Sequence, residues 1–109
     1  MIKIEIYKKN GLFFGFRSKG HADYSDGEYD IVCAGVSTLT QTLYFYLHGK
    51  GITDTEESQK QGYLYYKIKR DIEKQEVQGA FEFMITGLEL LQRDYSKYIQ
   101  FKIMEVQND

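Results

Sequence analysis

The chain has 109 residues, which suits a single domain over residues 1–109, and it contains one cysteine and no proline or tryptophan. Fourteen basic residues against sixteen acidic ones give a formal net charge of −2. This charge provides no overall attraction to nucleic acid, although it does not exclude a local basic patch. One cysteine cannot form an internal disulfide, and no stretch reaches the roughly 20 apolar residues of a membrane span. We therefore expect a cytoplasmic protein with neither a membrane nor a nucleic acid as a direct partner.

The chain opens with a predicted β-hairpin. Isoleucine recurs at every second position of a first strand over about 2–8, which is the period of a strand with one buried face. Asn10-Gly11 follows, and this pair is a strong hairpin signal because both positions tolerate positive φ. Apolar residues alternate again over about 12–18, which places Phe14 on the buried face of the return strand.

A loop and a helix are expected next. Residues 20–29 have no periodicity and are rich in glycine and acidic side chains. Asp30 can cap a helix, because its carboxylate can accept from the backbone N–H groups of the first turn. Apolar residues then recur at helical spacing until about Gly49, and Cys33 falls near the start on a different face. The polar segment 51–62 is expected to be a surface loop.

The remaining elements complete a two-layer arrangement. A strand is predicted over 63–68, a helix over 73–93 and a last strand around 99–103, which gives the order ββαβαβ. This order predicts an α+β two-layer sandwich, with one mixed sheet and two helices on one face. The opposite sheet face is expected to carry an aromatic and only partly polar set of the kind that often marks interfaces: Tyr7, Phe13, Tyr63, Tyr65, Lys67 and Lys102.

His21 and Cys33 are the candidate chemical groups. The unpaired N–H groups and the macrodipole at a helix start favour negative charge, so they favour the thiolate of Cys33. The same N–H groups could receive the oxyanion of a tetrahedral intermediate. His21 begins the loop, whose closure could bring it beside the thiol for acyl transfer through a thioester. From spacing alone, a packed cysteine and a solvated histidine are the more frequent alternative.

The stretch "GHADYSDGEYDIVCAGVS" (Gly20–Ser37) carries a resemblance to a known family. It resembles the signature of the ribosomal-processing cysteine proteases, the Prp family. That signature consists of Gly-His-Ala, a short acidic or glycine-containing loop, then Asp-Ile-Val-Cys-Ala, a small residue and a hydrophobic-Ser pair. The resemblance extends over the whole chain in length and element order. This agreement at fixed spacing is far more specific than a lone histidine and a lone cysteine.

The resemblance implies a function. It implies a small cytoplasmic cysteine endopeptidase that removes the N-terminal extension of ribosomal large-subunit protein twenty-seven, next to a Phe-Phe or Phe-Ala step. It also implies a homodimer in which Cys33 is the nucleophile and His21 activates the thiol and protonates the leaving amine. We expect no cofactor and no metal.

Two further motif residues have alternative roles. Asp30 either caps the helix or orients His21, and its sequence position favours the cap. Ser37 lies one turn after Cys33 on the same helix face. It either contacts the substrate or tunes the thiolate, or its hydroxyl bonds back to its own helix.

The rest of the motif has weaker assignments. Ala34 supports the site beside the cysteine, and Gly20 and Gly27 are either hinges of the loop or ordinary turn glycines. Two other functions stay open. The protein could be a non-catalytic, ribosome-associated binding module in which Cys33 is packed inside. It could also be a hydrolase with the same dyad that acts on another peptide or on an ester.

Overall fold

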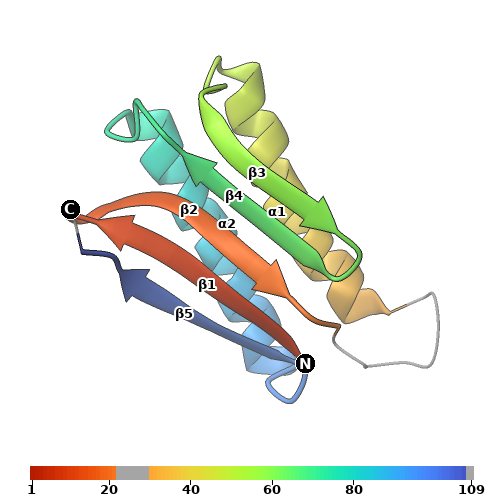
Figure 1. The fold of residues 1–109 in the computed structure, drawn as a ribbon. Helices are drawn as coiled ribbons and strands as arrows, with labels where there is room; N and C mark the ends of the chain where they lie inside the picture. Colours follow the sequence, from red (N-terminus) through yellow and green to blue (C-terminus); the bar gives the residue numbers. More distant parts are fainter. Residues whose placement is uncertain (22–29, 108–109) are drawn as a thin grey trace.

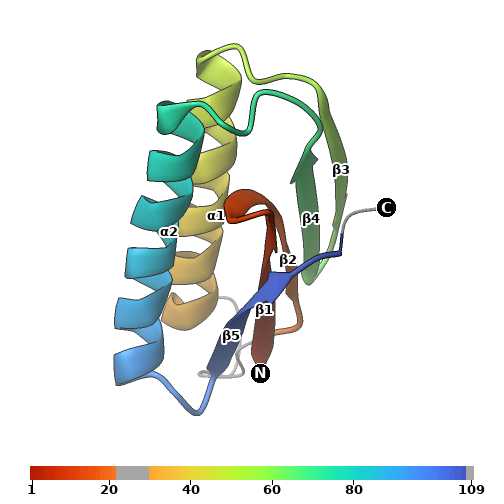
Figure 2. The same ribbon diagram turned by 90° about the vertical axis from the view of Figure 1, so that its left-hand side faces the viewer.

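A computed structural model describes residues 1–21 and 30–107 of the chain. Within these residues the elements are β1 (Ile2–Lys9), β2 (Leu12–Lys19), α1 (Ile31–Gly49), β3 (Thr55–Lys60), β4 (Tyr63–Ile68), α2 (Gln75–Asp94) and β5 (Ile99–Glu105). The strands form one sheet in the order β3-β4-β2-β1-β5, and β1 with β5 is its parallel pair. Both helices cover the same face of this sheet (Figures 1 and 2).

This architecture confirms the predicted α+β class, but it contains one strand more than the predicted order. Residues 51–62 were expected to form a loop, whereas Thr55–Lys60 form β3 and the order is ββαββαβ. The sequence TEESQK has no apolar alternation, so it lacks the usual strand signal. The strand exists because it pairs along its length with β4 at the edge of the sheet, where polar side chains are well tolerated.

The first hairpin forms as predicted, and its turn has the expected geometry. Asn10 and Gly11 have φ values of 53° and 79°. The pairing of β1 with β2 shifts register between Tyr7 and Lys8, so the β2 strand contains a bulge. Because β2 contains one extra residue at the bulge, its residues between the bulge and the turn lie on the opposite sheet faces from those that an unbroken alternation predicts.

The bulge makes the predicted faces of Phe13 and Phe14 wrong. The Phe14 ring lies 6.1 Å from that of Tyr7 on the open sheet face, while Phe13 stacks 5.8 Å from Phe81 of α2. Gln78 of α2 binds both backbone groups of Phe13, because its Oε1 accepts from the Phe13 N–H and its Nε2 donates to the Phe13 carbonyl, each at 2.9 Å. The amide side chain thus replaces ladder bonds that the bulge disrupts.

The core lies between the sheet and the two helices. Its largest fully buried side chains are Tyr66, Phe16, Phe81, Ile4, Ile6, Leu47, Leu88 and Ile99. The helices approach closely at Gly87, where a Cβ atom would lie 2.6 Å from the Leu39 side chain. Neither helix of the described chain combines the length and the apolar character that a membrane crossing requires.

Candidate active site

The site lies where three elements meet at one end of the molecule. The end of β2, the start of α1 and the turn between β3 and β4 come together there (Figure 1). They enclose a cleft of about 270 Å³. The cleft is lined by Ile2, Ser18, Gly20, His21, Cys33, Val36, Ser37, Thr40, Gln41, Gln59, Lys60, Gly62, Tyr63 and Leu64. His21 and Cys33 therefore share one cleft, although they come from opposite ends of the intervening loop.

Cys33 is the third residue of α1 and is half-buried. Asp30 is the N-cap, as predicted, and its Oδ1 accepts from the backbone N–H groups of Val32 at 3.0 Å and Cys33 at 3.1 Å. The N–H of Ala34 donates to the Asp30 carbonyl at 3.0 Å. Against our expectation, the N–H groups of Val32 and Cys33 do not stand open to an oxyanion, because the cap already occupies them. The helix start still favours negative charge at the thiol.

His21 is exposed and lies directly after Gly20, which anchors the end of β2. The Gly20 N–H donates to the Gly62 carbonyl at 2.8 Å. Gly20 has a φ of 102°, and a Cβ atom there would lie 2.5 Å from the Met1 carbonyl oxygen. Gly20 therefore has a structural reason to be glycine, and its hinge role stays a prediction.

Gly62 in the β3–β4 turn is a site residue that the sequence analysis missed. A Cβ atom on Gly62 would lie 2.8 Å from Nε2 of His21, so the imidazole packs directly against this glycine. The signal was present as Gln61-Gly62, a pair with a glycine at a turn position between two strands. The loop predicted over 51–62 hides this signal, because it places no strand before the turn.

Ser37 lines the cleft one turn after Cys33 with an exposed side chain. Thr38 and Thr40 of the same helix donate to the carbonyls of Ala34 and Val36, at 2.8 Å and 2.9 Å. Among the residues that the structure describes, the Ser37 hydroxyl makes no such bond. This arrangement favours the reading in which Ser37 presents its hydroxyl to the cleft.

A second hollow of about 300 Å³ continues the cleft and shares Gln41, Gln59 and Leu64 with it. Its other lining residues are mostly aromatic: Phe16, Tyr44, Phe45, Glu57, Tyr65 and Tyr66. The Tyr44 and Tyr66 rings meet edge to face at 5.4 Å. The Tyr66 hydroxyl is buried without a hydrogen-bond partner in the described chain, and burial raises its pKa. We call this second hollow the aromatic hollow.

Some predicted features lie outside the described residues. Gly27 and the loop that was expected to close over the substrate belong to residues 22–29, so the predictions about them stay predictions.

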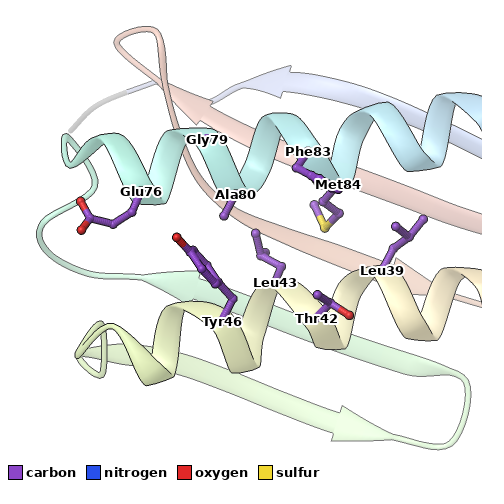
Figure 3. Close-up of a pocket in the computed structure, with 9 residues that line it drawn as sticks. All are labelled: Leu39, Thr42, Leu43, Tyr46, Glu76, Gly79, Ala80, Phe83 and Met84. Atoms are coloured by element: carbon purple, nitrogen blue, oxygen red, sulfur yellow. The ribbon is translucent and has the colours of Figure 1, made fainter.

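An apolar groove lies away from His21 and Cys33. This groove of about 470 Å³ runs between α1 and α2, with Tyr46 and Leu43 facing Ala80, Phe83 and Met84 (Figure 3). Its full lining is Leu39, Thr42, Leu43, Tyr46, Glu76, Gly79, Ala80, Phe83 and Met84. It holds neither candidate chemical group, so we assign the chemistry to the smaller and more polar cleft.

The cleft contains the parts of a cysteine peptidase, namely a thiol at a helix start and an imidazole that borders the same space. The family model of cysteine protease Prp matches residues 1–100. The chain therefore belongs to the cysteine protease Prp family and is a cysteine protease, as the motif predicted.

One curated relative agrees with this assignment, and two solved structures share the fold. The chain is 31% identical over 87 residues to the ribosomal processing cysteine protease Prp of Bacillus subtilis (strain 168), a match that covers 73% of this chain and 76% of the relative. It superposes on the ribosomal processing protease Prp from S. aureus, bound to a covalently linked product peptide, with a TM-score of 0.81 and 23% identity, over 95% of this chain and 100% of that one. It superposes on SMU.848 from Streptococcus mutans with a TM-score of 0.79 and 26% identity, over 97% and 96% of the two chains.

Proposed function

We propose that this chain is a cytoplasmic endopeptidase that removes a short N-terminal extension from a ribosomal protein precursor through a His21–Cys33 dyad. The observation that supports it most directly is that these two residues line one cleft in a member of a cysteine protease family. The substrate class is supported by the relatives, which are ribosomal processing proteases. The particular precursor that we propose is ribosomal large-subunit protein twenty-seven.

The chemistry follows from the two side chains. The Cys33 thiolate attacks the scissile carbonyl carbon, so that a C–S bond forms and the carbonyl oxygen becomes an oxyanion. The C–N bond then breaks while imidazolium His21 gives its proton to the leaving amine. A water molecule then attacks the thioester carbon while His21 takes one of its protons, and the C–S bond breaks. The new carboxylic acid leaves and loses its proton to solvent, which restores the Cys33 thiolate and the His21 imidazolium. The start of α1 favours the thiolate before the attack and after the release.

The aromatic hollow supports a substrate with aromatic side chains at the cleavage site. Tyr44 and Phe45 provide accessible ring surface on which a phenylalanine side chain packs well. Because this hollow adjoins the cleft, one phenylalanine of a Phe-Phe step can occupy it while the backbone passes Cys33. We therefore propose a Phe-Phe step beside the scissile bond.

Cleavage of the purified precursor by the parent and by Cys33→Ala, Cys33→Ser and His21→Ala tests the dyad. The two Cys33 variants should give no shortened product by mass spectrometry, and His21→Ala should lower kcat/KM by about 100-fold or more, in the range of a general base. Circular dichroism checks that each variant is folded. If Cys33→Ala shortens the precursor at the parental rate, the dyad is wrong.

The two alternative functions predict different outcomes of simple assays. A dyad hydrolase with another substrate would leave the precursor intact and yet cleave other peptides or esters in a Cys33-dependent manner. A non-catalytic binding module would keep Cys33 inert. Rapid alkylation by iodoacetamide near neutral pH, slowed in His21→Ala, is expected for the enzyme.

We also propose that the protein is a homodimer, as the resemblance implies. The groove between α1 and α2 is the surface that supports an interface best, because it is apolar and because Phe83 beside it is 71% exposed (Figure 3). A second copy placed there would cover this ring.

A further inference from the structure

The sheet face that the helices do not cover carries an ordered pattern of side chains. The strand register places three rows across this open face. The first row holds Gln100, Lys3, Lys19, Tyr63 and Lys60, and the second holds Lys102, Glu5, Arg17, Tyr65 and Ser58. The third holds Met104, Tyr7, Gly15, Lys67 and Glu56. We call these three rows the open face.

The charge of the open face differs in sign from that of the whole chain. Its rows contain six basic residues and two acidic ones, whereas the chain as a whole has fourteen basic and sixteen acidic residues. Glu5 is compensated within the face, because its Oε1 accepts from Arg17 at 2.6 Å and from the Tyr7 hydroxyl at 2.9 Å. The remaining surface therefore carries the acidic excess. Our expectation of no nucleic-acid partner depended on the net charge, which averages over these two regions.

Each of the first two rows holds one tyrosine beside basic residues. Lys19 of β2 is the register partner of Tyr63, and Arg17 is the partner of Tyr65. The Tyr7 ring centroid lies 6.5 Å from that of Tyr65, which extends the aromatic surface toward β1. Each of the three tyrosines is partly exposed. A cation beside a ring on a flat surface can bind a phosphate while the neighbouring base stacks on the ring.

We propose that the open face binds single-stranded RNA. The positive excess selects a polyanion over an ordinary protein surface. Among polyanions, unpaired bases are the chemistry that half-exposed tyrosines recognise, because every base has a face that stacks on an aromatic ring. The apolar groove between α1 and α2 lacks the positive charge of the open face and has no part in the proposal. The open face adjoins the peptidase site, because Lys60 and Tyr63 also line the cleft and Tyr65 also lines the aromatic hollow. RNA binding uses neither His21 nor Cys33, so it does not depend on the proposed peptidase chemistry.

The experiment measures fluorescence anisotropy of a labelled uridine oligomer of about 15 nucleotides, a length within the usual range of single-strand platforms. With about four phosphates neutralised, a fourfold rise in salt should weaken binding about 50-fold. The Lys3→Gln/Lys102→Gln variant should bind about tenfold more weakly at low salt and should show about half the parental salt slope. Tyr65→Leu should bind about tenfold more weakly with an unchanged salt slope.

The matched control is Lys50→Gln/Lys74→Gln, which removes the same charge at the helix ends, outside the open face. Its RNA affinity should stay within about twofold of the parent. Equal weakening by both pairs would show attraction by net charge alone and would overturn the proposal. An inert Tyr65→Leu, or equal affinity for duplex RNA, would overturn the stacking of single strands. If Lys3→Gln/Lys102→Gln changes the sedimentation mass of the RNA-free protein, the face is an interface between copies and the proposal fails.

Discussion

Gly62 is the residue through which the β3–β4 turn reaches His21, the histidine of the proposed dyad. A Cβ atom there would lie 2.8 Å from Nε2 of His21 and 3.3 Å from its Cε1, so the imidazole must move when Gly62 is replaced by alanine. A displacement of this size commonly costs between one and two orders of magnitude in rate. We therefore expect Gly62→Ala to lower kcat/KM on the precursor by about tenfold or more.

Gly11 provides the control for backbone strain. Its φ of 79° is close to the 71° of Gly62, but a Cβ atom on Gly11 would meet nothing within 4 Å. Alanine at either position costs about 1 kcal/mol in the left-handed region. Chemical unfolding should show a similar loss of stability in both variants, while kcat/KM falls in Gly62→Ala alone. An equal loss of activity in Gly11→Ala would show that strain, and not contact with His21, is the cause.

Asp30 allows its two proposed roles to be separated by a conservative change. Asp30→Asn keeps a capping oxygen for the N–H groups of Val32 and Cys33, whereas Asp30→Ala removes it. We expect Asp30→Ala to lower the free energy of unfolding by about 1 kcal/mol and Asp30→Asn to lower it by less. If Asp30 acts as the cap, Asp30→Asn keeps the parental pH profile of kcat/KM. A shifted pH profile with unchanged stability would instead assign Asp30 to the orientation of His21.

At the scale of residues, the sequence predicts the features that depend only on neighbouring residues in the chain. The cap at Asp30 and the position of Cys33 in the first turn follow from a few neighbouring residues, and the structure has both. Gly62 lines the cleft and Tyr66 the aromatic hollow, and both are distant in sequence from His21 and Cys33. Local turn and strand signals exist for both residues, but only the strand pairing places them at the site. The expectation that N–H groups of the first helical turn receive an oxyanion follows from helix-start geometry alone. That geometry leaves out the N-cap side chain of Asp30, which accepts from the same N–H groups.

At the scale of elements, Gln78 of α2 holds the bulge in β2. Besides its two bonds to Phe13, its Nε2 donates to the Ile72 carbonyl at 2.6 Å. Replacement by alanine leaves these part-buried backbone groups without this partner, which should cost about 2–3 kcal/mol of unfolding free energy. Urea unfolding measures the loss. Gln75→Ala, at an exposed position in the first turn of the same helix, should change stability by less than about 0.5 kcal/mol, and an equal effect would contradict the role of Gln78.

The two errors in the predicted elements have a common physical origin. Periodicity reports which face of a strand is buried, but β3 is a polar edge strand and the bulge in β2 inserts a residue into the period. In both cases hydrogen bonds to another segment decide the structure: β3 pairs with the backbone of β4, and the Gln78 side chain of α2 bonds to the backbone of Phe13. The remaining strands and both helices were predictable because their own apolar spacing specifies them.

At the scale of the whole molecule, the open face links stability to pH. Burial, together with the hydrogen bond to Glu5, raises the pKa of Tyr7 from 10.0 to about 12. The unfolded chain therefore loses this proton near pH 10, while the folded chain keeps it to about pH 12. The stabilisation is complete below pH 10 and is lost as the pH rises toward 12.

Tyr7→Phe tests this linkage. Near neutral pH the variant should be less stable by about 1 kcal/mol, because it loses the hydrogen bond to Glu5. It cannot ionise at this position, so the difference from the parent should shrink as the pH rises from 10 to 12. Urea unfolding at a series of pH values measures the difference. A difference that stays constant across this range would show that Tyr7 does not titrate as described.

Two exposed aromatic residues that line different hollows can separate the proposed homodimer from substrate binding. Phe83 is 71% exposed beside the groove between α1 and α2, while Phe45 is 65% exposed and borders the aromatic hollow. Because both rings are solvent-exposed, lysine at either position should leave the core intact. We expect Phe83→Lys to sediment as a monomer, since a charge would be buried at the interface. Phe45→Lys should remain a dimer with a raised KM, and a monomeric parent, or dissociation by Phe45→Lys instead, would contradict this placement of the interface.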